Sequence, residues 1–408
     1  MSDLVERHSF KRGTPQYNEL DNTMWLGKNL FNATLYNVRQ HFFNTGEFLG
    51  YYKLQKAFQD SSQPDYTALP AKVAQHVMQD VDKSFLSFFR ALKEYKKNPS
   101  KYQGRPRMPK YKDKKKGRYM LRYTYQAISK RILDKYGQIK LSGLDVYIDT
   151  KLKYEQIKEV RVIQKVNSIV VEIVYGSEDV QELPDNGLYA AIDLGVSNFA
   201  TVTSNKKGFQ PMIVDGRKVK SYNRYYNKEK AKKQSILKKR NNKRTSNEIK
   251  RLTEKRNNKM SDFIHKSSRV IVNQLVSEGI NTLVIGHNKG WKQDINIGKH
   301  NNQNFTEIPF SRFISTISYK CRMVGIRVIV TEESYTSKCS FLDMEEICKH
   351  DSYAGKRVKR GLFRSGGGSL INADVNASYN ILRKCMPKAF ADGVEGVLVH
   401  PRITKILN

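Results

Sequence analysis

The sequence has 408 residues, with 73 Lys and Arg against 39 Asp and Glu, which gives a formal net charge of +34. This length predicts two or three domains, and a hydrophobic content of 39% with 11% aromatic residues excludes a wholly disordered chain. So much positive charge predicts a polyanionic partner, with nucleic acid as the first candidate and an anionic membrane as the second.

The charge falls in several blocks, whereas a membrane-surface helix would concentrate it in one segment. No run of about 18 apolar residues predicts a transmembrane helix, and the first residues carry no apolar signal sequence. The cysteines follow no disulfide pattern, so a reducing interior is expected. They are Cys321, Cys339, Cys348 and Cys385.

Residues 1–118 are expected to form a helical region that ends in a basic arm. Thr14 and Pro15 are typical of a helix start, and apolar spacing predicts a second helix from about Pro70 to Tyr95. Prolines exclude a helix over 97–118. The tyrosines among its Lys and Arg residues favour contact with a nucleic-acid backbone over a solvated linker. The candidate binding residues of this arm are Arg105, Arg107, Lys110, Lys112, Lys114, Lys115 and Lys116.

Residues 119–185 alternate in short β-rich runs, which predicts a small antiparallel sheet or barrel with a hairpin turn at Asn167 and Ser168. A linker with acids and Pro184 then marks a boundary near residue 185. The segment 217–259 holds 18 Lys or Arg residues and 3 Asp or Glu residues, so we expect a long basic helix or helical hairpin that binds a polyanion. Its candidate binding residues are Lys238, Lys239, Arg240 and Arg244.

The remaining pattern of residues 186–408 has the order of an RNase H-like α/β fold. Three strands and the basic segment precede a helix over 261–278, and a strand, a helix over 309–324 and another strand follow. An irregular basic insertion over 338–371 then leads to a helix over 373–385. The fold class is therefore predicted as α+β and multidomain.

Two acids stand where a metal site would need them. Asp193 ends an apolar strand, where a charge is costly unless it is paired or binds metal; the alternative is a turn cap. Asp374 begins the last helix, where capping that helix is the alternative. Asn376 and Asn380 follow on the same helix. Carboxylates that converge on one sheet face can hold two Mg²⁺ ions for phosphodiester hydrolysis.

These motifs resemble those of the TnpB (OrfB) proteins of small insertion-sequence transposons and of the compact type V CRISPR effectors. The resemblance rests on IDLG at Asp193, HKS at His265–Ser267, YTSKC at Tyr335–Cys339 and DVNASYNI at Asp374–Ile381. It implies an RNA-guided DNA endonuclease with a RuvC nuclease domain at 186–408. The helical region 1–118 and a wedge-like β region 119–185 would then hold the guide RNA and the target double-stranded DNA.

The sequence departs from this family at the fourth strand, where a catalytic glutamate is usual. Here the strand reads LVIGHN, so Gly286 or His287 occupies the place. Because the fourth and fifth strands of such a sheet are parallel neighbours, Glu333 at the end of the fifth strand is predicted to substitute, with Glu332 as the second choice. The alternative is that both glutamates are merely exposed.

A second departure concerns zinc. Relatives often carry two CxxC pairs in the insertion, whereas here Cys339 and Cys348 stand singly, with Asp343 and His350 nearby. A structural zinc site needs four ligands, so zinc is not expected. The predicted cofactor is Mg²⁺, as two ions held by Asp193, Glu333 and Asp374.

The leading hypothesis is an RNA-guided DNA endonuclease that recognises a short target-adjacent DNA motif, works in a prokaryotic cytoplasm at the nucleoid and has no membrane partner. The alternatives are a nuclease-inactive RNA-guided repressor, which Gly286 favours, and a DNA transposase. A homodimer is compatible with all three.

Overall fold

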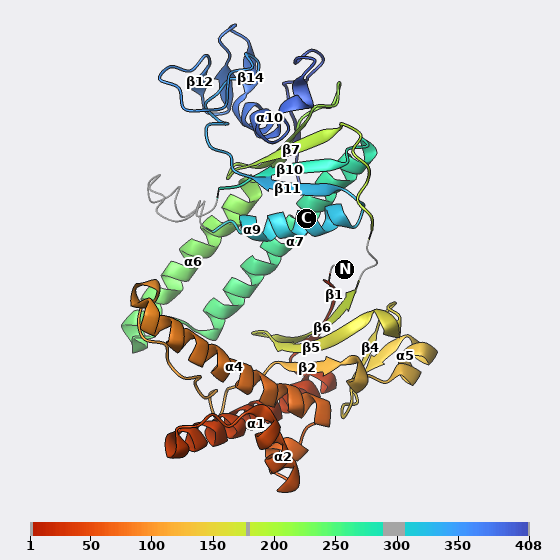
Figure 1. Cartoon of the computed structure of the whole chain (residues 1–408), viewed down its shortest axis with the longest axis vertical. Helices are drawn as coiled ribbons and strands as arrows, with labels where there is room; N and C mark the ends of the chain where they lie inside the picture. The colour runs from red at the N-terminus through yellow and green to blue at the C-terminus, as the bar shows by residue number, and fades with distance from the viewer. Residues whose placement is uncertain (1–2, 177–179, 289–306, 407–408) are drawn as a thin grey trace. The chain divides into compact units, whose positions relative to one another are not determined.

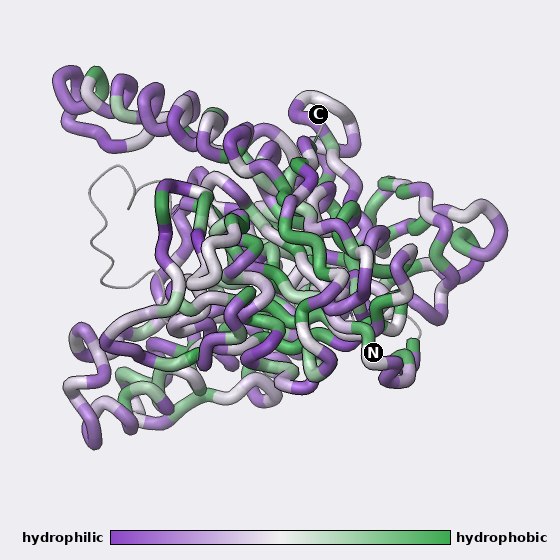
Figure 2. Tube along the Cα trace, turned by 90° about the horizontal axis from the view of Figure 1, so that it is seen from above, coloured by the Kyte–Doolittle hydropathy of each residue, from purple (hydrophilic) through white to green (hydrophobic). Residues whose placement is uncertain are grey.

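The computed structural model of the chain describes residues 3–176, 180–288 and 307–406. The chain divides into two compact units, Met1–Glu178 and Asp179–Asn408, whereas the sequence placed a boundary near residue 185. No helix in the described ranges is long and apolar enough to cross a membrane. Hydrophobic residues gather inside the trace, and many of its outer turns are hydrophilic (Figure 2).

The first unit is built on helices that share one hydrophobic core. They are α1 (Pro15–Thr45), α2 (Tyr51–Asp60), α3 (Pro64–Thr67) and α4 (Ala71–Lys97). The helix start predicted at Thr14 is confirmed, because the Thr14 side chain accepts a hydrogen bond from the backbone N–H of Tyr17. Gly46, in the left-handed conformation, ends α1.

The first unit also contains an antiparallel sheet in the order β1-β6-β5-β2 and a separate hairpin, β3-β4. The strands are β1 (Asp3–Lys11), β2 (Leu121–Thr124), β3 (Gln138–Lys140), β4 (Tyr147–Asp149), β5 (Ile157–Gln164) and β6 (Ser168–Gly176). The predicted turn at Asn167 and Ser168 joins β5 to β6. As described, β1 and β2 are opposite edges, so the barrel alternative is wrong. Four strands are too few to enclose a packed interior, and α1 and α4 pack against the sheet instead.

Two elements of the first unit were not predicted. Residues 3–11 form β1 rather than helix, and this strand pairs with β6 along its whole length. Its mixed polar sequence carries little strand signal, so the edge of β6 decides its structure. The other element is α5 (Lys130–Tyr136), which Ser129 caps and a left-handed Gly137 ends.

The second unit contains a sheet in the order β11-β10-β7-β8-β9-β15. Its strands are β7 (Tyr189–Leu194), β8 (Asn198–Ser204), β9 (Met212–Asp215), β10 (Thr282–Gly286), β11 (Arg327–Thr331) and β15 (Arg402–Thr404). β7, β8 and β9 are antiparallel neighbours, and β10 is parallel to β7. The predicted parallel pairing of the fourth and fifth strands is confirmed, with Gly286 of β10 opposite Thr331 of β11.

Helices cover both faces of this sheet (Figure 1). They are α7 (Asn247–Ser277) and α9 (Phe310–Arg322) on one face and α10 (Ala373–Cys385) on the other. Each face has its own hydrophobic cluster. The central strands β7, β8 and β10 are therefore largely buried.

The basic segment forms the predicted helical hairpin. α6 (Arg217–Asn241) turns at Asn242, in the left-handed conformation, into α7. The helix predicted over 261–278 is confirmed, but it is the C-terminal part of α7, which begins at Asn247 rather than near residue 261. No helix-breaking residue interrupts it there, and Met260 and Phe263 are buried against the rest of the unit.

The insertion over 338–371 is only partly irregular. It contains a small antiparallel sheet of β12 (Lys356–Lys359), β13 (Leu362–Arg364) and β14 (Leu370–Asn372). These strands, like the unpredicted β15, have only three or four residues. Such short segments contain too few alternating apolar positions to be recognised from the sequence.

Candidate active site and nucleic-acid interface

Asp193 and Asp374 approach each other because β7 and α10 are packed together. Ala191 of β7 belongs to the hydrophobic cluster that includes α10, and residues two apart in a strand point to the same face. Asp193 therefore faces the α10 side of the sheet. The Ser378 hydroxyl of α10 donates a hydrogen bond to the Ala191 carbonyl at 3.1 Å. This contact brings the first turn of α10, with Asp374, to the end of β7.

The environment of Asp193 disfavours its charge. Burial raises the pKa of Asp193 well above its usual range, and the neighbouring Asp374 and Glu333 raise it further, while Arg357 acts in the opposite direction. The three predicted acids therefore lie near enough to interact. Repulsion among acids of this kind is typical of a site that binds cations.

Asn372, and not Asp374, caps α10. The Asn372 side chain accepts hydrogen bonds from the backbone N–H groups of Asp374 at 3.0 Å and Val375 at 3.2 Å. The capping alternative for Asp374 is thus excluded. One carboxylate oxygen of Asp374 instead accepts a hydrogen bond from Asn198 Nδ2 at 2.5 Å, and the other lies 3.6 Å from a guanidinium nitrogen of Arg357.

Glu332 and Glu333 face different ways after β11. Glu332 is exposed and forms an ion pair with Lys384 at 2.6 Å. Glu333 Oε2 is buried without a hydrogen-bond partner in the described residues, and burial, together with Glu332, raises the pKa of Glu333 to about 7. A Cβ on Gly286 would lie 2.5 Å from this oxygen. Glu333 therefore fills the space above the position where the similar family carries its glutamate.

The acids suit a hard cation by donor type, since carboxylate oxygen is the ligand that Mg²⁺ prefers. The buried, unpartnered Oε2 of Glu333 is a further sign of a missing partner. In the ranges that the structure describes, however, no three His, Cys, Asp or Glu side chains are gathered closely enough to hold a metal ion. The donor set fits a metal, and the side chains would have to move closer to share one.

The two asparagines of the DVNASYNI motif hold the start of the insertion. The Asn376 side chain accepts from the backbone N–H of Phe341 and donates to the Cys339 carbonyl, both at 2.9 Å. Asn380 donates to the carbonyls of Thr336 and Cys339. The DVNASYNI motif thus binds the backbone of the YTSKC motif through both asparagines.

Two carboxylates brace the insertion from within. Asp343 accepts hydrogen bonds from the backbone N–H groups of Gly366 and Gly367. Glu345 accepts from Ser340 at 2.6 Å and from Ala354 at 2.8 Å. These hydrogen bonds join segments of the insertion that are far apart in the chain. A structural zinc ion would connect distant segments in the same way.

The basic arm is an ordered segment anchored to α1. The backbone carbonyl of Lys114 accepts a hydrogen bond from the buried ammonium of Lys28 at 2.8 Å, and Asn32 exchanges two hydrogen bonds with the backbone of Lys112. The predicted cations of the arm and of the α6–α7 turn are all exposed. Tyr111 is also exposed, with the Arg39 guanidinium 5.1 Å from its ring centroid.

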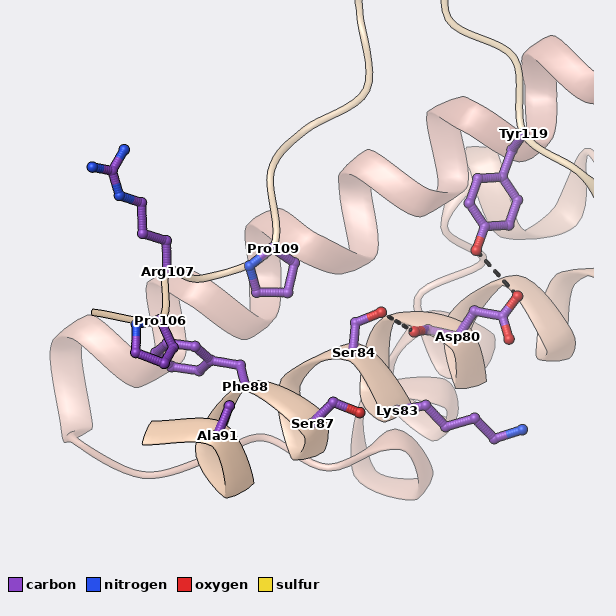
Figure 3. Close-up of a pocket in the computed structure, with 10 residues that line it drawn as sticks. All are labelled: Asp80, Lys83, Ser84, Ser87, Phe88, Ala91, Pro106, Arg107, Pro109 and Tyr119. Carbon is purple, nitrogen blue, oxygen red and sulfur yellow. Dashed lines mark hydrogen bonds between the residues drawn. The ribbon is translucent and has the colours of Figure 1, made fainter. Parts of the chain in front are cut away.

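A groove of about 670 Å³ separates the arm from α4. Pro106 and Arg107 of the arm lie beside Phe88 of α4, and the Tyr119 hydroxyl donates to Asp80 at 3.1 Å (Figure 3). The groove offers apolar, hydroxyl and cationic groups together, as surfaces that bind single-stranded nucleic acid do.

Sequence reasoning missed Asn198 and Arg357, which contact Asp374. Asn198 follows Asp193 in the GVSN turn, so its position next to the first acid was the available signal. Arg357 lies among the many cations of the insertion and carried no signal of its own.

Residues 172–292 match the family model OrfB_IS605, described as a probable transposase, and residues 310–381 match the Cas12f1-like TNB domain. None of the curated proteins compared with the chain matches it. A solved Cas12f1–sgRNA–target DNA complex is similar at 15% identity, over 93% of this chain and 98% of that chain, with a TM-score of 0.37.

A CRISPR-Cas12f ternary complex is similar at 15% identity, over 88% of this chain and 80% of that chain, with a TM-score of 0.36. The mini-RNA-guided endonuclease CRISPR-Cas_phi3 is similar at 10% identity, over 98% and 94%, with a TM-score of 0.45. The two family matches confirm the resemblance predicted from the motifs: one segment of the chain is similar to the OrfB_IS605 transposases and another to the Cas12f1-like TNB domain.

Proposed function

We propose that this protein is an RNA-guided DNA endonuclease with an RNase H-like (RuvC) core. The observation that carries the proposal is the approach of Asp193, Glu333 and Asp374 from three elements to one sheet face, with a buried, unpartnered oxygen on Glu333. Three antiparallel strands followed by two parallel strands, with α10 on the acidic face, support the RNase H-like assignment.

Asp193, Glu333 and Asp374 would hold two Mg²⁺ ions. When bound, such ions supply an activated water and stabilise the leaving oxygen in phosphodiester hydrolysis. The chain's own groups would prepare the acids for that role. Asn198 orients the Asp374 carboxylate through its hydrogen bond. The burial of Glu333 Oε2 keeps bulk water from solvating this oxygen.

The basic arm, its groove and the α6–α7 hairpin would bind the guide RNA and the target double-stranded DNA. Their exposed cations suit contacts to phosphates, which supply affinity without sequence preference. Base pairing with the guide would supply most of the sequence recognition, and the protein would read a short target-adjacent motif.

The test begins with sequencing of the RNA that co-purifies with the protein. A plasmid that matches this RNA is then incubated with the complex and Mg²⁺, comparing the wild type with Asp193→Ala and with Asp392→Ala, an exposed acid outside the site. The proposal expects cleavage by the wild type and the control variant alone. Equal cleavage by Asp193→Ala would exclude the proposed site.

Two other functions have an observation in their favour. The lack of a gathered metal site among the described residues favours a nuclease-inactive RNA-guided repressor. Tight guided binding without product at high Mg²⁺ would select it. The description of the matched family as transposases favours DNA joining, and strand transfer in the absence of RNA would select that activity.

A further inference from the structure

A pocket of about 470 Å³ opens beside Asp374. Its walls are the turn between β7 and β8, the β12 strand of the insertion with the two residues that follow it, and the first turn of α10. Its volume lies in the range of roughly 300–1,000 Å³ that is typical of small-molecule sites. The lining residues are Gly195, Val196, Ser197, Asn198, Arg357, Arg360, Gly361 and Asp374.

The pocket holds more positive than negative charge. Arg357 and Arg360 line it together with a single acid, Asp374. Arg360 donates a hydrogen bond to the Ser197 hydroxyl oxygen at 3.0 Å, and Lys220 of α6 donates to the same oxygen at 3.2 Å. Ser197 thus fixes Arg360 at the pocket and also binds Lys220, and the excess of positive charge attracts an anion.

Arg357 is held less firmly than Arg360. Its guanidinium lies 3.6 Å from Asp374, which is beyond hydrogen-bond distance, and half of its side chain is exposed. Exposed ion pairs of this kind contribute little to stability and exchange partners readily. A phosphate, which accepts two parallel hydrogen bonds from a guanidinium, is a stronger partner.

We propose that this pocket binds a phosphodiester of the strand that reaches the acids, and that Arg357 moves from Asp374 to this phosphate. Arg360, fixed by Ser197, is the static phosphate ligand. Without a strand, Arg357 neutralises Asp374 and opposes cation binding there. An arriving strand removes this opposition, so strand binding and metal binding favour each other. The inference rests on the proposed function.

The test measures binding rather than cleavage, on the full chain. Mn²⁺ affinity is followed by electron paramagnetic resonance without DNA, and the affinity for a fluorescent oligothymidine is measured by anisotropy in EDTA. The control is Lys359→Ala, which removes an exposed positive charge from the same strand. We expect Arg357→Ala to tighten Mn²⁺ binding roughly fivefold or more relative to this control, and to weaken oligothymidine binding.

Arg360→Ala should weaken oligothymidine binding with no change in Mn²⁺ affinity relative to the control. Arg357→Lys should restore part of the wild-type behaviour. If Arg357→Ala and Lys359→Ala behave alike in both assays, the inference is overturned. Asp374→Asn distinguishes failure of the proposed function from failure of this inference. If Asp374→Asn leaves Mn²⁺ binding unchanged, the proposed acidic site itself is wrong. If Asp374→Asn abolishes Mn²⁺ binding while Arg357→Ala has no effect, only the inference is refuted.

Discussion

The Glu333 carboxylate lies over Gly286, so that a Cβ on Gly286 would fall 2.5 Å from Oε2 and 2.6 Å from Ile381 Cδ1. Gly286 is opposite Thr331 in the parallel register, and Glu333 comes two residues later. Glu333, which follows the end of β11, therefore places its carboxylate next to Gly286 at the end of β10. A carboxylate can reach this place from either strand, provided that the other strand has no side chain there.

The first prediction is that the carboxylate can be moved back to β10. Glu333→Gln should lower the rate of guided cleavage at least about a hundredfold, because it removes one of the carboxylates proposed to hold Mg²⁺. Gly286→Glu alone should also impair cleavage, since its side chain would collide with Glu333 and Ile381. The double variant Gly286→Glu/Glu333→Ala removes the collision with Glu333 and should cleave faster than Gly286→Glu alone or Glu333→Ala alone. Plasmid nicking rates give the comparison.

Glu332→Gln is the matched control for this series. It removes a neighbouring carboxylate that faces Lys384 instead of Asp193. Its cleavage rate should stay close to the wild type. A loss as large as that of Glu333→Gln would show that the choice between the two glutamates is wrong.

The second prediction concerns Asn198 as a positioning residue. Asn198→Ala removes the hydrogen bond to Asp374, and partners that orient metal ligands are typically worth about 10–100-fold in metal affinity. Mn²⁺ affinity should therefore fall by about tenfold. Asn186→Ala removes an amide far from the acids in the same unit and serves as the control. An unchanged Mn²⁺ affinity in Asn198→Ala would refute the role.

The position of the acids could be reasoned from the sequence because each has a local signature. Asp193 is a charge at the end of an apolar run, and Asp374 opens a helix that follows an insertion. Of their partners, Asn198 has only its nearness to Asp193 in the chain as a signal, and Arg357 has none. Their roles depend on which turn and which short strand meet at Asp374, and that is set by tertiary packing.

The same distinction holds for the fold. α1 and α10 carry caps and apolar spacing along their own length, so their sequences predict them. β1 and β15 exist because an edge of another strand pairs with them. Their sequences contain too little periodicity to specify a strand without that partner.

The third prediction is a reduced salt dependence of nucleic-acid binding. Replacement of Lys110 and Lys115 by Ala removes two exposed cations of the basic arm. If both contact phosphates, the slope of log K against log salt concentration should fall by about 2. Lys53→Ala/Lys56→Ala, on the exposed side of α2, is the charge-matched control and should leave the slope nearly unchanged. Equal slopes for the two double variants would count against the arm as a binding surface.

The fourth prediction is a pH dependence caused by Lys320. This residue of α9 is buried at 5% exposure and donates to the His265 carbonyl and the Ser268 hydroxyl, next to the HKS motif of α7. Burial, assisted by the nearby Arg269, lowers the pKa of Lys320 from 10.5 to about 8. Between pH 8 and 10.5 Lys320 is therefore protonated more fully in the unfolded chain than in the folded chain. The contribution of Lys320 to the free energy of unfolding consequently rises with pH in this range.

The measurement is the difference in the free energy of unfolding, from denaturant titrations, between the wild type and Lys320→Met across this pH range. The difference should shift in favour of the wild type as pH rises from 8 to 10.5, by an amount on the order of 3 kcal/mol. Below pH 8 it should be constant. A difference that stays flat throughout would show that Lys320 is not desolvated in the folded protein.

The fifth prediction is that the insertion over 338–371 holds its structure without zinc. Asp343 and Glu345 already join its distant segments through backbone N–H groups. Treatment with a zinc chelator should leave limited proteolysis of the insertion unchanged. Glu345→Gln should speed its cleavage, because a charge-assisted hydrogen bond contributes about 1.5–3 kcal/mol. Glu346→Gln, at the adjacent position, is the control. Rapid cleavage after chelation alone would instead indicate a metal bound through Cys339 or Cys348.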